Sequence, residues 1–96
     1  MKHCIVEITY TAPIGIIDEV LPEHRAYLQR GYDSGMLLCS GPMTPRTGGI
    51  IVARAESIEA ITRFFESDPY RVRGAADYRF IEFSPVKHQP FLQEWV

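Results

Sequence analysis

The sequence predicts an α+β fold, in which a four-stranded antiparallel sheet carries two helices on one face. Three observations support it: two-residue alternation near both ends of the chain, two stretches of helical periodicity, and a pair of short apolar runs joined by a Pro- and Gly-bounded loop. In chain order the segments read β-α-β-β-α-β, which is the split βαβ, or ferredoxin-like, arrangement. Residues 1–96 are expected to form one domain, with 88–96 as a C-terminal tail.

A change of period marks the first strand and the first helix. Residues 3–10 alternate between two faces, as a strand does. From 14 to 34 the apolar positions recur at helical spacing, and an Asp-Ser-Gly stop follows. Pro22 is expected to begin the main helix at its first turn, with 14–21 as a looser lead-in.

The middle of the chain predicts a hairpin. Residues 36–40 and 50–55 are short apolar runs, separated by a loop around 43–47 that Gly41-Pro42 and Gly48-Gly49 bound. We interpret Gly48-Gly49 as a flexible turn, because neither a lysine nor a helix start follows it, as a phosphate-binding loop would require.

The second half predicts another helix and the last strand. Ser57 is the expected N-cap, and the helix stops at Asp68-Pro69. A brief irregular or helical segment, 70–76, precedes a strand at 78–86. The tail ends with apolar side chains, including Trp95, and is expected to dock on another surface.

The last strand carries apolar side chains on both faces. Tyr78 and Phe80 point one way, whereas Ile81 and Phe83 point the other, and a half-solvated sheet would alternate more cleanly. A domain of this size also buries only about two-thirds of its unfolded surface. We therefore expect a second copy to cover the open sheet face, giving a homodimer or higher homo-oligomer built as a dimeric α+β barrel.

Charge and cysteine content exclude several classes of partner. The 10 basic and 12 acidic residues give a net charge of −2, which attracts neither nucleic acid nor anionic membranes, so a small-molecule ligand is expected instead. Glu7 interrupts the first apolar run and no export signal is visible, which favours a cytoplasmic protein. Cys4 and Cys39 lie far apart in apolar runs and are expected to be buried and reduced.

Two ionisable residues fall on the apolar stripes of the predicted helices. His24 continues the stripe of the first helix and should face inward. Asp68 continues the second stripe at the helix C-terminus, where the dipole disfavours a carboxylate and a partner is needed. A His beside an Asp is oriented and made more basic, as a general base requires. The alternatives are a core or interface histidine and a turn-forming aspartate.

Other polar residues give weaker signals. Ser40-Gly41-Pro42 places a hydroxyl and an open backbone where a ligand could approach, although a Gly-Pro turn explains the segment equally well. His3 and His88 have no partners at metal-ligand spacing, so both are read as surface residues and no metal site is expected.

Several motifs together resemble the YCII-related (YciI-like) protein family over almost the whole chain. They are Pro22-Glu23-His24, Tyr27-Leu28, the run from Gly35 to Pro42, Gly48-Gly49, Ser57-Ile58-Glu59-Ala60 and Asp68-Pro69-Tyr70. The resemblance implies a dimeric α+β barrel and an active site around His24 and Asp68. It also implies a small cytoplasmic enzyme that needs no cofactor, since one branch is associated with removing chloride from a chlorinated hydroxyquinol. Family members often carry an arginine three residues before the histidine, whereas Leu21 stands here.

The resulting hypothesis is an enzyme with a pocket between the sheet and the helices. His24 would act as general acid and base, with Asp68 orienting it, in elimination, isomerisation or hydrolysis of a small metabolite, such as an aromatic, quinone or lactone. Ser40, Gly41 and Pro42 would hold the substrate, and Tyr70 and Phe64 would form pocket walls. The alternatives are a non-catalytic ligand-binding or accessory dimeric module and, ranked lower, a cofactor-free or haem-linked monooxygenase.

Overall fold

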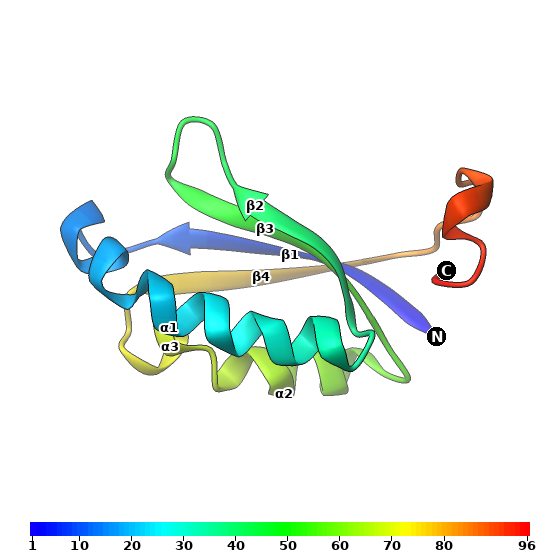
Figure 1. The fold of residues 1–96 in the computed structure, drawn as a ribbon, viewed down its shortest axis with the longest axis horizontal. Helices are drawn as coiled ribbons and strands as arrows, with labels where there is room; N and C mark the ends of the chain where they lie inside the picture. The colour runs from blue at the N-terminus through cyan, green and yellow to red at the C-terminus, as the bar shows by residue number, and fades with distance from the viewer.

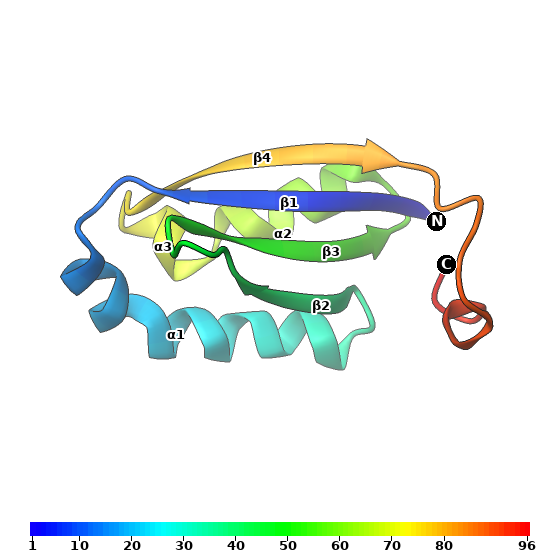
Figure 2. The same ribbon diagram turned by 90° about the horizontal axis from the view of Figure 1, so that it is seen from above.

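The computed structural model describes residues 1–96 and shows a four-stranded antiparallel sheet with its helices on one face (Figure 1). In the sheet the strands lie in the order β2-β3-β1-β4 (Figure 2). Together with the chain order, this is the ferredoxin-like α+β fold, so the predicted fold class is confirmed. The elements are β1 (Lys2–Tyr10), α1 (Ile14–Asp33), β2 (Leu37–Pro42), β3 (Gly48–Ala55), α2 (Ile58–Glu66), α3 (Pro69–Val72), β4 (Ala76–Phe83) and the 3₁₀ turn η1 (Pro90–Leu92).

Helix α1 is one continuous helix that contains Pro22, so the prediction that Pro22 begins the helix is wrong. Proline removes one hydrogen bond of the helix. The helix continues because its buried stripe runs unbroken through Ile17, Val20, His24 and Leu28, while Pro22 lies on the exposed side. No helix of the protein is both long and apolar enough to cross a bilayer.

Helix α2 begins at the predicted cap. The side-chain oxygen of Ser57 accepts a hydrogen bond from the backbone N–H of Ala60 at 3.1 Å. Ile61 and Phe65 then face the sheet and are fully buried. These anchors hold the end of α2, and therefore the segment that follows it, against β1 and β3.

Replacing Ser57 with alanine should lower the free energy of unfolding by about 1 kcal/mol, because the N–H of Ala60 loses its acceptor. Denaturant unfolding followed by circular dichroism measures the change. The matched control is Ser84→Ala at an exposed serine that caps no helix, and its unfolding should stay unchanged. Equal stabilities of the two variants would contradict the role of the cap.

Gly48 and Gly49 do not form the flexible turn that we expected. They are the first residues of β3 and pair with Thr9 and Ile8 of β1. A Cβ atom at Gly48 would lie 1.8 Å from the carbonyl oxygen of Ile8, so the close approach of the two strands requires glycine there.

The sheet face opposite the helices is uncovered in the single chain (Figure 1). Ile5 at its centre pairs with Val52 on one side and Ile81 on the other, which makes an apolar row across three strands.

The two cysteines differ in exposure. Cys39 pairs with Val52 after an irregularity in β2 and is exposed, whereas Cys4 is buried. The expectation of two buried cysteines is therefore wrong for Cys39.

The tail docks at the end of the sheet, beside the N-terminus (Figure 2). Trp95 packs edge-on against His3 with ring centroids 5.5 Å apart, and its carbonyl oxygen accepts a hydrogen bond from Arg54 at 2.7 Å. His3 is therefore buried, contrary to the expectation of a surface residue. Burial, with the positive charges of the N-terminus and Arg54, lowers the pKa of His3.

Candidate active site

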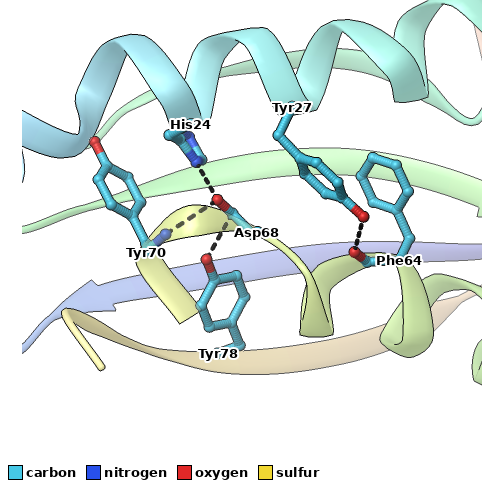
Figure 3. A network of polar contacts seen from close by, with 6 residues as sticks. All are labelled: His24, Tyr27, Phe64, Asp68, Tyr70 and Tyr78. Atoms are coloured by element: carbon cyan, nitrogen blue, oxygen red, sulfur yellow. Dashed lines mark hydrogen bonds and ion pairs between the residues drawn. The ribbon is translucent and has the colours of Figure 1, made fainter. Parts of the chain in front are cut away.

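Helix α1 presents His24 to the inside of the protein. His24 lies one turn after Val20 on the buried stripe and is 8% exposed. Its Nδ1 atom lies 2.7 Å from Oδ1 of Asp68, a residue 44 positions further along the chain (Figure 3). The structure therefore brings together the two residues that the sequence singled out.

Asp68 is positioned by the turn between α2 and α3, not by α2 as we predicted. Helix α2 ends at Glu66, and Asp68 is the N-cap of α3, where its Oδ1 accepts from the N–H of Tyr70 at 3.3 Å. The expected conflict with the dipole of α2 is therefore absent. The two interpretations of Asp68, as a cap and as the partner of His24, hold at once.

Tyr78 is the third donor to the carboxylate, and no pattern in the sequence assigned it to the site. Its hydroxyl donates to Oδ2 of Asp68 at 2.6 Å (Figure 3). Burial, followed by the charge and the hydrogen bond of Asp68, raises the pKa of Tyr78 well above its usual range, so it stays a neutral donor. Because the fully buried carboxylate accepts from three donors, its orientation is fixed.

The imidazole of His24 is held in one orientation by a second contact. The ring of Tyr70 stacks on it with centroids 4.1 Å apart and planes inclined by 20°. With Nδ1 donating to Asp68, Nε2 is the free basic nitrogen, and it makes no hydrogen bond within the chain. This is the arrangement in which a histidine can accept a proton from a ligand.

A cavity of about 450 Å³ opens beside this histidine, between α1 and the strands β1, β2 and β3. Among the residues proposed from the sequence, all but Asp68 and Phe64 lie on its wall; Asp68 stands behind His24, and Phe64 instead stacks on Tyr27. The residues that line the cavity are Ile8, Tyr10, Leu21, His24, Arg25, Leu28, Ser40, Gly41, Pro42, Arg46, Gly49, Ile50, Ile51 and Tyr70.

The segment Ser40-Gly41-Pro42 belongs to β2 and lines the cavity opposite α1. The hydroxyl groups of Ser40 and Tyr32 lie 2.5 Å apart and share a hydrogen bond, which holds the serine side chain. A Cβ atom at Gly41 would meet nothing within 4 Å, so the packing of the protein does not itself require glycine there.

Arg46 is a further wall residue that sequence reasoning missed. It lies in the loop between β2 and β3, and periodicity predicts nothing about which way a loop side chain points. The only available signal for Tyr78 was its alternation in the last strand, which placed it on the same face as Phe80. Alternation gives the face of a strand and not the contact that a side chain makes there.

The fold and the site define a class of protein: a small α+β domain in which a buried histidine–aspartate pair adjoins a cavity. The family model of the YCII-related domain matches residues 1–84, and the chain belongs to the YCII-related family. Protein YciI of Escherichia coli and Protein YciI of Shigella flexneri are each 35% identical to it, in a match that covers 71% of this chain and 78% of the relative.

A solved structure has a similar fold. It is the 5-chloro-2-hydroxyhydroquinone dehydrochlorinase (TftG) of Burkholderia phenoliruptrix AC1100 in complex with 2,5-dihydroxybenzoquinone. The two chains superpose with a TM-score of 0.70 and 21% identity, over 95% of this chain and 98% of the other. At this identity the likeness shows the shared fold.

Proposed function

We propose that this protein is an enzyme that transfers protons to and from a small quinone-like or phenolic metabolite. The observation that carries the proposal is the contact of 2.7 Å between Nδ1 of His24 and Oδ1 of Asp68 at the wall of the cavity. A dehydrochlorinase with the same fold and a quinone in its complex supports this choice of substrate class. His24 would be the general acid and base, and Asp68 would orient it and stabilise its protonated form.

The chemistry requires one proton acceptor and an acidic carbon. Nε2 of His24 takes the proton from a carbon beside a carbonyl group, and the electrons of the C–H bond move into an enolate. Where the adjacent carbon carries chlorine, the carbonyl re-forms as chloride leaves with the electrons of the C–Cl bond, so the sum is loss of HCl. Without a leaving group, return of the proton to another atom gives an isomer.

Solvent exchange tests the proposal without knowledge of the natural substrate. Chlorinated and unchlorinated hydroxyquinols and hydroxyquinones are incubated with the protein in D₂O. Mass spectrometry measures deuterium incorporation into each compound, and the release of chloride is measured in parallel. We expect protein-dependent deuterium incorporation or chloride release with at least one of them. Ligand binding without either event would refute the enzyme and leave the ligand-binding module as the function.

We also propose that a second copy of the chain covers the open sheet face. The row formed by Ile5, Val52 and Ile81 is partly exposed in the single chain, and Phe83 at the end of β4 is 39% exposed. Two such faces in contact would bury these side chains. Glu7 and Arg79 pair in the sheet and carry opposite charges, so each could contact the other residue of the second copy across the interface.

Sedimentation equilibrium at micromolar concentration should give twice the chain mass of 11.0 kDa. Ile81→Glu places a charge in the apolar row and should shift the protein to the monomer. The control is Glu59→Gln on the exposed side of α2, which should remain dimeric. A wild-type monomer under these conditions would refute the second copy.

A further inference from the structure

The hydroxyl group of Tyr70 is an unexplained feature of the cavity. Tyr70 is 1% exposed, yet its hydroxyl oxygen has no hydrogen-bond partner in the chain. The ring stands beside His24, and its hydroxyl points away from Asp68 (Figure 3). A buried polar group without a partner destabilises the free protein, and such a group on a cavity wall is suited to bind a ligand atom.

Two residues place a hydroxyl group and a positive charge near this hydroxyl. The ring of Tyr10 lies edge-on to Tyr70 with centroids 5.8 Å apart, and the guanidinium of Arg46 lies 5.9 Å from the centre of the Tyr10 ring. Of the two arginines that line the cavity, Arg46 is the one whose charge acts on the hydroxyl of Tyr70. The cavity thus has a donor-rich corner next to the general base.

The present partner of Arg46 is easily exchanged. Its guanidinium lies 2.7 Å from Oδ1 of Asp18, and the two side chains are 36% and 54% exposed. Because exposed ion pairs are weak, an anionic ligand atom can replace Asp18 at little cost. The loop between β2 and β3 therefore supplies a positive charge at this corner of the cavity.

We infer that Tyr70 and Arg46 form an oxyanion-binding subsite, which takes the enolate or phenolate oxygen of the substrate. The inference rests on the proposed function, since the subsite shares a cavity with the base. The oxygen of Tyr70 would donate its proton in a hydrogen bond, while Arg46 would neutralise the charge that develops as His24 removes a proton.

The protonation state of Tyr70 agrees with this role. Burial, above all, together with the neighbouring Tyr10 and Asp68, raises the pKa of Tyr70 to about 12. At neutral pH the residue is therefore a protonated phenol, which can donate to an anionic oxygen. The ligand chemistry that fits is a small, planar, acidic enol or phenol.

Calorimetric binding of two probes tests the subsite separately from catalysis. The first is 2,5-dihydroxybenzoquinone, an acidic enol that is anionic at neutral pH, and the second is its dimethyl ether, which keeps the ring and has no acidic hydroxyl. The wild type should bind the acidic probe more tightly. Tyr70→Phe and Arg46→Gln should each reduce that preference by about 10- to 100-fold, as expected for a lost hydrogen bond to a charged group.

The controls separate a specific subsite from general charge and from misfolding. Arg73→Gln removes an arginine that is likewise ion-paired, at 3.0 Å to Glu23, but lies off the cavity, and it should keep the preference. Tyr70→Phe should melt at the same temperature as the wild type or higher, because it removes an unpartnered hydroxyl.

Three outcomes would overturn the inference: no preference in the wild type, an unchanged preference in both Tyr70→Phe and Arg46→Gln, or an equal loss in Arg73→Gln. The variant His24→Gln distinguishes a failure of the subsite from a failure of the proposed function. It should lose the deuterium exchange or chloride release that tests the proposed function. It should keep the preference for the acidic probe, since it changes the base and leaves the subsite in place.

Discussion

Replacing His24 with glutamine should lower the rate of deuterium exchange or chloride release by a factor of about 10² to 10⁴, the usual contribution of a general base. Glutamine can still donate a hydrogen bond to Asp68, but it cannot take up a proton at neutral pH. Binding of the same compounds should change by only a few-fold. The measurement is kcat and KM for the compound that reacts, with the dissociation constant from calorimetry.

His3→Gln is the matched control, because His3 is also a buried histidine but lies at the opposite end of β1, away from the cavity. Its rate should equal that of the wild type. A His24→Gln protein that retains the wild-type rate would remove His24 from the mechanism. A protein that loses binding together with rate would instead indicate that His24 holds the ligand.

The sequence singled out His24 and Asp68, because the spacing of both in the sequence continues a series of apolar residues at helical period. Periodicity reports which side of an element is buried, and a charged residue on that side requires a partner. The order of strands and helices was predictable for the same reason. The fold then converts two inward positions, 44 residues apart, into one contact of 2.7 Å.

The ends of the helices were less predictable than the buried faces that periodicity indicates. Pro22 favours a helix start by its own geometry, but the continuous buried stripe on both sides of it outweighs one lost hydrogen bond. Asp68 was placed at the end of a helix, whereas it lies in the turn beyond the end of α2 and caps α3. In each case tertiary packing decided between conformations that the local sequence allows.

The remaining parts of the site come from contacts between segments that are distant in the sequence. Tyr78 reaches Asp68 from β4, and Arg46 reaches the cavity from a loop. Neither contact leaves a periodic signal in its own segment. The register of β1 against β4, which pairs Ile8 with Tyr78, sets the depth at which the tyrosine meets the carboxylate. Alternation within a strand specifies its two faces but not which residue of the neighbouring strand lies opposite.

Replacing Asp68 with asparagine should reduce both stability and rate. The amide nitrogen cannot accept a hydrogen bond, so at most one of the two former carboxylate oxygens still serves the donors His24, Tyr70 and Tyr78. We expect the free energy of unfolding to fall by about 1 to 3 kcal/mol. Turnover should fall by about 10²-fold, because the protonated imidazole loses its negatively charged partner.

A double-mutant cycle with Tyr78→Phe shows whether the tyrosine acts through the carboxylate. The single change removes the donor to Oδ2 of Asp68 and should itself lower stability by about 1.5 to 3 kcal/mol. In Asp68→Asn the bond to Tyr78 is already altered, so the two losses should sum to more than the loss in the double variant. Additive losses, measured by denaturant unfolding, would show that Tyr78 contributes by packing alone, and the three-donor description of Asp68 would then be wrong.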